Sequence, residues 1–308
     1  MKAARISETG SVDVITLLDI EAPDVKNGQV LIEVAASSIN PVDMKIREGA
    51  FPVGPLPLTL GGDVAGVVLK VGSGVTGLKV GDKVYGQAAV VSGGSGAFAE
   101  IAAAPADHIA PMPDVSFEQA ASLPLVGASA IQALNEHLNL QSGQKLFIHG
   151  GAGGIGSMAI QIAKNKGAYV ATTATGEGIA FVRSLGADEV IDYKSQDFST
   201  TLKEFDAVFD LVGGPDFEKA LHILKPGGIG VSMVAEAADV AKTLGVTAIH
   251  QGTHVDTTKL TQLAAFVNSG VVTPQVFETF PLSQIKEAFT AFESGHVKGK
   301  IVIIVKSV

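Results

Sequence analysis

A glycine cluster between a short apolar run and a helical segment constrains this chain more than any other feature of its sequence. Gly151, Gly153 and Gly156 fit the pattern G-x-G-x-x-G. Residues 146–148 before the cluster are apolar, as in a buried strand, and residues 157–166 after it have the apolar spacing of a helix that packs on a sheet. A strand before and a helix after is the context in which this pattern binds a dinucleotide. The alternative interpretation is a glycine-rich turn that holds no ligand.

Each glycine has a physical role in such a site. One allows a tight turn, one lets the backbone approach a pyrophosphate, and one allows the helix and the strand to pack closely. The start of the helix then presents free N–H groups and a partial positive charge to the phosphates. We therefore expect the cofactor to bind at consecutive residues of the motif, which are Gly151, Ala152, Gly153, Gly154, Ile155 and Gly156.

The composition is that of a globular protein and limits its partners. The 308 residues are enough for two domains of about 150 residues each. A hydrophobic content of 46% with 17% charged residues argues against disorder. The net charge of −9 argues against nucleic acid or an anionic membrane as the main partner.

Two features predict a cytoplasmic protein, and a third is compatible with that location. The N-terminal residues MKAARISETG contain no apolar segment of a signal peptide. No apolar run approaches the length of about 18 residues that a transmembrane helix needs. The chain has no cysteine, which excludes disulfides and thiolate-bound zinc and suits a cytosolic enzyme.

The first 120 residues predict a β-rich domain. Short apolar segments alternate with glycine turns, which is typical of a partly closed barrel or a sandwich, with one helical turn near residues 41–49. The expected strands include residues 30–35, 64–71, 97–103 and 108–111.

From Ser116 onward the pattern changes to alternating helices and strands. Ser116 is a plausible N-cap for the first of these helices. Alternation of this kind predicts parallel βαβ units. The expected strands are residues 146–148, 169–173, 189–191, 207–211, 229–234 and 247–251, and the expected helices between them include residues 157–166, 179–185 and 217–224.

The last elements lie beyond the nucleotide-binding unit, and we expect them to fold back onto the first domain. They comprise a helix at 259–267, a strand at 275–280, a helix at 282–292 and a strand at 300–305. The predicted organisation is a catalytic domain at 1–120, a dinucleotide-binding domain at 121–265 and a return to the catalytic domain at 266–308.

Several segments, in the same order, resemble signatures of the zinc-independent branch of the medium-chain dehydrogenase/reductase family, with quinone oxidoreductases and enone reductases as the most similar members. The matching segments are NPVDMKIREG at 40–49, GGDVAGVV at 61–68, LPLVGASA at 123–130, GAD at 186–188 with Asp192 and Tyr193, and GHVKGKIV at 295–302. The resemblance implies an α/β chain with a GroES-like barrel domain, a Rossmann domain and an active site in the cleft between them. It also implies a homodimer that pairs through the edge of the Rossmann sheet.

We expect no metal ion. A catalytic zinc needs about three Cys, His or carboxylate ligands. Zinc-dependent relatives carry histidine and glutamate where this chain has Gly62 and Asp63, and the cysteine-rich lobe of those relatives is missing. The seven histidines are scattered along the chain.

Without a metal, alcohol oxidation lacks an obvious Lewis acid, whereas hydride transfer to a quinone or an activated alkene needs mainly positioning and a donor to the oxygen that gains charge. The resemblance places Asn40 and Asp43 near the nicotinamide, although Asn-Pro and Asp also suit a plain turn. Lys45 could donate a proton or hydrogen bond if burial lowers its pKa, or it could be a solvated surface lysine.

Other residues are expected at the cofactor. Ser129 replaces the threonine common in the family and either reaches the cofactor or bonds back within its helix. Leu211, Val212 and Gly213 end the fourth strand of the Rossmann domain, and their backbone groups would meet the nicotinamide ribose or carboxamide. The alternative is a plain strand end and turn.

The second strand of the Rossmann domain predicts NADP(H) rather than NAD(H). An acidic residue about 20 positions past the first glycine would bind the ribose 2′-hydroxyl of NAD. The sequence around Thr173 has hydroxyls there instead, and Glu177 comes too late. Tyr193 matches a family position that contacts the 2′-phosphate, while the lysine of many relatives is Gly178 here and Arg183 is the nearest alternative cation.

The predicted function is NADPH-dependent reduction of a quinone or an α,β-unsaturated carbonyl. A second possibility is a zinc-free alcohol dehydrogenase or an enoyl reductase. A third is a redox-inactive protein that senses NADPH or binds RNA, although the acidic charge and the lack of basic-aromatic patches count against RNA.

Overall fold

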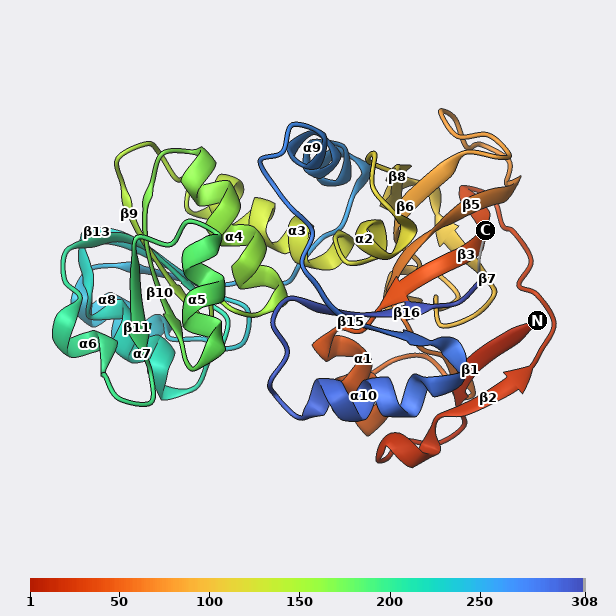
Figure 1. Ribbon diagram of the computed structural model, residues 1–308, viewed down its shortest axis with the longest axis horizontal. Helices are drawn as coiled ribbons and strands as arrows, with labels where there is room; N and C mark the ends of the chain where they lie inside the picture. Colours follow the sequence, from red (N-terminus) through yellow and green to blue (C-terminus); the bar gives the residue numbers. More distant parts are fainter. Residues whose placement is uncertain (307–308) are drawn as a thin grey trace. The chain divides into compact units, whose positions relative to one another are not determined.

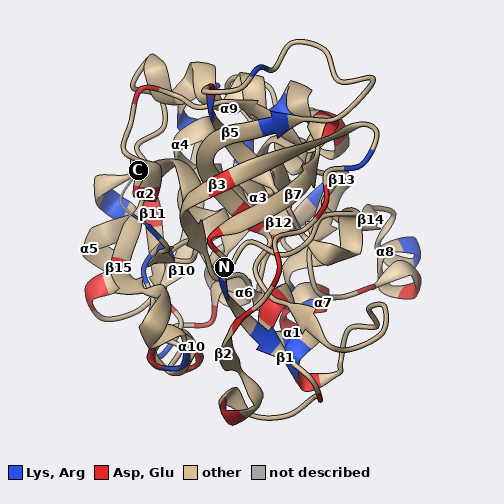
Figure 2. Cartoon of the chain, turned by 90° about the vertical axis from the view of Figure 1, so that its right-hand side faces the viewer, with Lys and Arg blue, Asp and Glu red and all other residues tan. Residues whose placement is uncertain are grey.

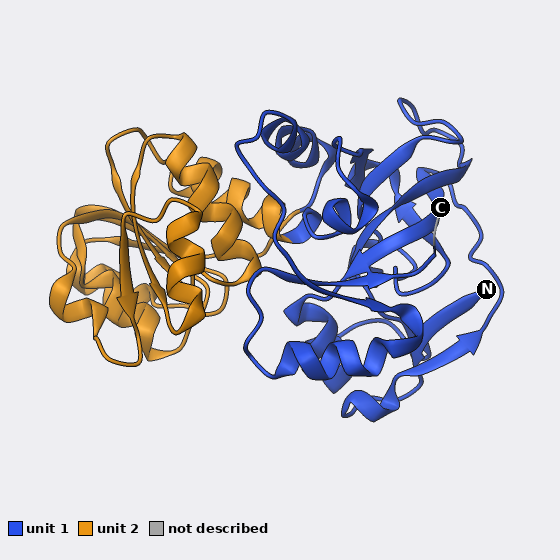
Figure 3. Cartoon of the chain, in the orientation of Figure 1, with its two compact units in different colours: residues 1–125, 255–308 blue, residues 126–254 orange. Residues whose placement is uncertain are grey.

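The computed structural model describes residues 1–306, which form two compact units. The first comprises Met1–Leu125 and the chain from Val255 onward, and the second comprises Val126–His254 (Figure 3). The first unit therefore contains both ends of the chain. The chain returns to it at Val255, whereas the sequence analysis placed this return at residue 266.

The second unit is built on a parallel sheet with helices packed against it (Figure 1). In spatial order the strands are β11 (Glu189–Asp192), β10 (Tyr169–Ala174), β9 (Lys145–His149), β12 (Phe205–Asp210), β13 (Leu224–Ser232) and β14 (Thr247–His250). The helices are the end of α3 (Pro124–Ile131), the π-helix η4 (Gln132–His137), α4 (Gly154–Asn165), α5 (Glu177–Ser184), α6 (Phe198–Thr201), α7 (Pro215–Leu221) and α8 (Ala238–Leu244).

This strand order is that of a Rossmann domain. The chain starts at β9, moves to β10 and β11 on one side, and then crosses to β12, β13 and β14 on the other. The order therefore reverses between β9 and β12, and ligands of such sheets bind outside the carboxyl ends of the strands at this switch point. Helices α4 and α5 pack against β9, β10 and β11, while α7 and α8 pack against β12, β13 and β14. The predicted α/β fold class is confirmed.

The core of the second unit follows from its apolar strands. Phe147, Val208 and Phe217 are fully buried in one cluster with the helices α6 and α7. Because parallel strands are covered on both faces, they are apolar along nearly their whole length. Polar side chains are consequently found where the strands end.

The first unit is β-rich and has two sheets (Figure 1). One has the order β2 (Thr16–Asp19), β1 (Lys2–Ile6) and β4 (Leu58–Thr59), and the other has the order β15 (Val276–Pro281), β16 (Lys300–Ile304), β3 (Gln29–Ser38), β5 (Asp63–Val71), β6 (Lys83–Gln87) and β8 (Ile109–Pro111), with β7 (Ile101–Pro105) paired to β3. Its helices are α1 (Pro41–Glu48), α2 (Phe117–Ala121), α9 (Thr257–Asn268) and α10 (Ile285–Glu293), with the short 3₁₀ turns η1 (Val12–Val14), η2 (Val90–Ser92), η3 (Ala106–His108) and η5 (Leu282–Gln284).

The C-terminal strand β16 lies in the larger sheet, where Val302 pairs with Ser38 of β3. The tail thus folds back onto the first domain, as the sequence predicted. Ile301 and Ile303 are fully buried together with Phe289 of α10. Burial of these side chains, each contributing about 1.5–3 kcal/mol, holds the tail in place.

Local sequence explains where α1 and α2 begin. Asn40 caps α1, Pro41 occupies its first turn, and Gly49 ends it with a left-handed φ of 79°. The predicted N-cap Ser116 is confirmed, since its hydroxyl accepts a hydrogen bond from Gln119 N in a capping box of α2.

Two sequence predictions for the second unit were wrong in detail. The helix expected at residues 217–224 ends at Leu221, and β13 begins at Leu224, before the Pro-Gly-Gly segment. The pairing of β13 with β12 skips this segment and resumes at Ile229, so Pro226 sits in a register shift where no ladder N–H is needed. In addition, β12 ends at Asp210, which leaves Leu211 in a loop.

Candidate coenzyme site and buried polar cluster

The glycine turn follows β9 and leads into α4. Gly150 has a φ of 94°, a left-handed conformation that favours glycine, and Gly153 is the N-cap of α4. Residues 152–155 are partly exposed, whereas Gly151 and Gly156 are buried. The turn therefore presents the N-terminus of α4 to solvent at the carboxyl end of β9.

The space around each glycine matches a dinucleotide site. A Cβ on Gly151 would lie 2.1 Å from Thr172 Oγ1, and a Cβ on Gly156 would lie 2.4 Å from Gly150 O. Neither position has room for a side chain. A Cβ on Gly153, by contrast, would find its nearest atom at 3.7 Å. The open side of Gly153 is where a diphosphate can approach the backbone, so the residues present fit this group.

Thr173 supports the turn from behind. Its Oγ1 accepts a hydrogen bond of 2.9 Å from Gly150 N, and its carbonyl accepts one of 3.2 Å from Gly151 N. The side chain is 2% exposed. The structure therefore gives Thr173 a role in holding the glycine turn.

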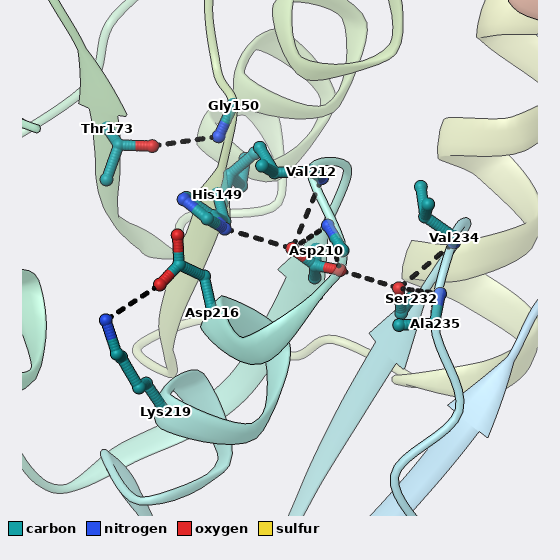
Figure 4. A network of polar contacts seen from close by, with 12 residues as sticks. His149, Gly150, Thr173, Asp210, Val212, Asp216, Lys219, Ser232, Val234 and Ala235 are labelled. Atoms are coloured by element: carbon teal, nitrogen blue, oxygen red, sulfur yellow. Dashed lines mark hydrogen bonds and ion pairs between the residues drawn. The ribbon is translucent and has the colours of Figure 1, made fainter.

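Polar side chains form a network at the carboxyl ends of β9, β12 and β13 (Figure 4). His149 Nδ1 lies 3.0 Å from Asp210 Oδ1, and Ser232 Oγ donates to Asp210 Oδ2 at 2.6 Å. Asp210 also accepts hydrogen bonds from the backbone N–H groups of Val212 and Gly213. Three strands and the loop 211–213 are thus joined through one carboxylate.

The carboxylate at the centre of this network is ionised. Burial alone would raise the pKa of Asp210, but the hydrogen bonds from His149, Ser232 and Gly213 together hold this pKa below its ordinary value. Because a carboxylate only accepts hydrogen bonds, His149 Nδ1 carries the proton in this contact.

Ser129 of α3 lies close to the chain that follows β14. Its Oγ is 2.6 Å from Thr253 Oγ1, and its carbonyl accepts a hydrogen bond of 3.1 Å from Gln251 Nε2. Ser129 is fully buried. In this arrangement its hydroxyl joins α3 to the segment after β14, and a direct bond to a cofactor stays a prediction.

Asp192, which was quoted above only for the family resemblance, lies near the expected ribose site. It ends β11 in register with Ala174 at the end of β10, and its carboxylate accepts hydrogen bonds from the Thr175 side chain and from Lys194 N. These bonds lower the pKa of Asp192. An acidic residue for the ribose was expected only in the segment around β10. Asp192 instead comes from the neighbouring parallel strand β11 and lies at the same edge of the sheet. The adjacent Tyr193 is 56% exposed.

In the first unit, four polar residues form a buried cluster. Asp63 Oδ2 accepts hydrogen bonds from Ser38 Oγ at 2.8 Å and from Asn40 Nδ2 at 2.7 Å, and it lies 3.6 Å from Lys300 Nζ. Lys300 Nζ donates to Asn40 Oδ1. The side-chain amide of Asn40 is thus bonded through both its nitrogen and its oxygen, and Asn40 is 1% exposed. The cluster joins α1 to β5 and β16.

Asp43 belongs to the same region and completes the cap of α1. Its Oδ2 accepts a hydrogen bond of 2.9 Å from Asn40 N and its Oδ1 accepts one of 3.2 Å from Gly61 N. Burial, with a contribution from the nearby Asp63, raises the pKa of Asp43 to about 7 despite these two bonds. Burial likewise lowers the pKa of Lys300, although the two carboxyl groups oppose the shift.

The three residues predicted to be catalytic differ in their surroundings. Asn40 and Asp43 are buried and bonded within the first unit, while Lys45, two residues after Asp43 in α1, is exposed. Their capping geometry matches the alternative interpretation of Asn40 and Asp43 as a turn. The exposure of Lys45 matches its alternative interpretation as a solvated surface lysine.

His149, Asp210 and Ser232 were missed in the sequence, as were Asp63 and Lys300. For the first three a signal existed, because each ends an apolar strand of a parallel sheet. The predicted strand at 229–234 placed Ser232 inside the strand and hid this pattern. No comparable local signal marks Asp63 and Lys300, whose partners lie far away in sequence.

Within residues 1–306, no group of three or more His, Cys, Asp or Glu side chains is arranged to hold a metal ion. No helix in this part of the chain combines the length and the apolar character that a membrane span requires. Basic and acidic segments are interspersed in the view of Figure 2.

Two family models match the chain. Residues 26–114 match the alcohol dehydrogenase GroES-like domain, and residues 185–303 match the domain described as zinc-binding dehydrogenase.

Known proteins resemble the chain over nearly its whole length. The 2-methylene-furan-3-one reductase of Solanum lycopersicum is 39% identical over 316 residues, which cover 98% of this chain and 79% of the relative. The chloroplastic NADPH-dependent alkenal/one oxidoreductase of Arabidopsis thaliana is 38% identical, with 98% and 79% covered. The structure of the quinone oxidoreductase from Coxiella burnetii superposes with a TM-score of 0.93 at 36% identity and covers 99% of both chains.

These similarities and the Rossmann and GroES-like domains show that the chain belongs to the medium-chain dehydrogenase/reductase family, in the branch of the quinone oxidoreductases and alkenal/one oxidoreductases. The resemblance seen in the sequence is confirmed.

Proposed function

We propose that this chain is an oxidoreductase that uses NADPH to reduce quinones or α,β-unsaturated carbonyl compounds. The observation that carries the proposal is the glycine turn before α4, where Gly153 is open to a diphosphate and Gly151 and Gly156 are closed to any side chain. The names of the tomato, Arabidopsis and Coxiella proteins support the class of substrate.

The second unit would hold the coenzyme. The N–H groups at the start of α4 would bind the diphosphate. The loop 211–213 and Ser129 would face the nicotinamide half, and Tyr193 would face the adenosine half. When bound, the coenzyme supplies the hydride.

The residues of the first unit would orient the substrate and donate a hydrogen bond to it. Quinones and enones are already polarised, so the protein has to orient them and stabilise the oxygen that gains charge. Lys45 stays the candidate hydrogen-bond donor as an accessible ammonium group, since its exposed side chain does not meet the burial first expected of it. Asn40 and Asp43 would act by holding the start of α1.

Turnover assays with a panel of quinones, enones and secondary alcohols test this proposal. We expect NADPH to be consumed with quinones or enones, and the protein to leave alcohols unoxidised in the presence of NADP⁺. Binding of NADPH without any turnover would favour the sensor instead.

The same assay run with NADH tests the coenzyme preference. Since β10 carries Thr172 and Thr173 and no carboxylate near its end, we expect kcat/KM to be about tenfold or more higher with NADPH. The carboxylate of Asp192 repels a 2′-phosphate, so Asp192→Asn should raise this ratio further. Equal kcat/KM for the two coenzymes in the wild type would reject the preference.

We retain a cytoplasmic location as part of the proposal. The Arabidopsis relative is named as chloroplastic, so the family also occurs in organelles.

A further inference from the structure

The last residues of three neighbouring strands carry a network that has no part in the proposed binding contacts. His149 ends β9, Asp210 ends β12 and Ser232 ends β13. In the parallel sheet Asp210 is in register with both of the others. All three residues are buried, and His149, the most exposed, is 4% exposed. The network lies at the switch point of the sheet, where the strand order reverses between β9 and β12.

The network holds the two loops that follow β12 and β13. Asp210 accepts hydrogen bonds of 3.3 Å from Val212 N and 3.1 Å from Gly213 N. Ser232 Oγ accepts bonds of 3.1 Å from Val234 N and 3.0 Å from Ala235 N while it donates to Asp210 (Figure 4). Without these acceptors the backbone N–H groups would lose their partners, and the loops would move to regain them.

His149 fixes the carboxylate from the other side. Its ring stacks on Phe147 with a centroid distance of 6.0 Å and an interplanar angle of 19°, and it packs against Phe198 at 5.2 Å. This packing leaves the ring little freedom to rotate. The donor Nδ1 therefore stays aimed at Asp210.

Each of the two loops presents an exposed valine. Val212 is 52% exposed and Val234 is 48% exposed. A Cβ on Gly150 would lie 3.2 Å from Val212 Cγ2, so Val212 stands against the glycine turn. A Cβ on Gly213 would lie 2.7 Å from Val234 Cβ, so Val234 stands against the loop that carries Val212. Both valines thus expose apolar side chains in the loops that follow β12 and β13.

We propose that His149, Asp210 and Ser232 are positioning residues that hold Val212 and Val234 as an apolar wall for the nicotinamide ring. The proposal rests on the proposed function, since it needs a pyridine coenzyme at this edge. None of the three buried residues touches the coenzyme. A flat ring that covers two exposed valines removes apolar surface from water, and this gain depends on loops that do not move.

Calorimetry with a whole coenzyme and with half of one tests the proposal. NADPH has the nicotinamide ring, whereas 2′,5′-ADP has only the adenosine half. We expect Ser232→Ala and His149→Leu to weaken NADPH binding about tenfold, and to change 2′,5′-ADP binding less than about twofold. His149→Asn keeps a donor near the position of Nδ1, so it should bind both ligands as the wild type does.

Two further variants complete the experiment. Lys219→Gln breaks the exposed ion pair of 2.9 Å between Lys219 and Asp216 on α7, next to the network but not bonded to it (Figure 4). We expect no change in either affinity. Val234→Ala shortens the wall without disturbing the buried network, so it keeps the test valid even if a buried variant fails to fold. It should weaken NADPH binding and leave 2′,5′-ADP unchanged.

Several outcomes would overturn the proposal. Variants that bind NADPH like the wild type would show that the loops do not form the wall. Equal weakening of NADPH and 2′,5′-ADP would show a merely structural role. In both cases the wild type still binds NADPH and the proposed function stands, whereas a wild type that binds neither ligand would remove the proposed function as well.

Discussion

At the scale of single residues, the titration of Asp43 makes the free energy of unfolding depend on pH. Its carboxyl group is 2% exposed, and its pKa is raised from 3.8 to about 7 chiefly by burial. Between these two values the folded chain keeps a proton that the unfolded chain releases. The free energy of unfolding therefore decreases as the pH rises through this interval, by about 1.4 kcal/mol per pH unit at most.

We expect Asp43→Asn to remove this pH dependence, since an amide does not titrate. The measurement is urea unfolding at about pH 5 and about pH 8, where the wild type should be more stable at the lower pH. Asp24→Asn, at an exposed aspartate, is the matched control and should keep the wild-type difference. An equal pH dependence in the wild type and in Asp43→Asn would contradict this account.

The sequence identified the residues of the glycine motif and singled out Asn40 and Asp43, but it did not identify their buried partners Asp63 and Lys300. A glycine motif is local, because its strand, turn and helix follow one another along the chain. Lys300 and Asn40 are bonded although 260 positions separate them. No local pattern reports such a contact, so this cluster could be found only in the folded chain.

At the scale of elements, the turn between β9 and α4 contains one glycine that is needed for packing and another that is needed for binding. Gly153 has a φ of −75°, which any residue adopts, and a Cβ there meets nothing closer than 3.7 Å. The same atom on Gly151 would lie 2.1 Å from Thr172 Oγ1. The two glycines are thus needed for different reasons.

Gly153→Ala should leave the thermal unfolding midpoint nearly unchanged and weaken NADPH binding about tenfold or more, because its methyl group occupies the approach of the diphosphate. Gly151→Ala should lower both the midpoint and the affinity. Thermal unfolding and calorimetry on the two variants measure these effects. If Gly153→Ala bound NADPH like the wild type, the diphosphate would not lie at this turn.

Most strands and helices of the second unit could be predicted, and the errors have a physical cause. The predicted helix at 217–224 and the predicted strand at 229–234 left residues 225–228 outside both elements, whereas β13 passes through them. Proline is tolerated there because the register shift against β12 leaves its position without a ladder bond. Strands β1 and β2, which lie in the small sheet, were not predicted at all.

At the scale of the whole molecule, the order of elements along the chain did not decide which unit each one joins. Helix α9 follows the last Rossmann strand and was expected among the tail elements that fold back onto the first domain, although the predicted domain boundary at residue 265 cuts through it. In the structure it belongs to the first unit, where Tyr85 Oη donates to Leu260 O at 2.6 Å and Thr257 Oγ1 donates to Ile109 O at 2.9 Å. These contacts join residues about 150 positions or more apart, beyond the reach of local patterns.

The expected homodimer would pair through the free edge of the Rossmann sheet. Strand β14 lies at one end of that sheet and pairs with β13. Gln251 N donates to Ser232 O, so by the alternation of a strand the N–H of Ala248 points away from β13. This group is available for pairing with a second copy of the chain.

Light scattering should therefore give about twice the chain mass of 31.5 kDa for the wild type. Ala248→Pro removes the outward N–H and should yield a monomer that still binds NADPH, while Ala248→Val keeps the N–H and should remain dimeric. A monomeric wild type, or a dimeric Ala248→Pro variant, would exclude pairing through β14.

By itself the sequence determined the class of fold, the place of the glycine turn and the family, because each depends on signals that lie close together along the chain. Only the tertiary structure decided that His149, Asp210 and Ser232 meet, and that Asn40 is bonded between Asp63 and Lys300. The reason is the register of the sheets. Which strand ends become neighbours is decided by the packing of the whole unit and by no single segment of the chain.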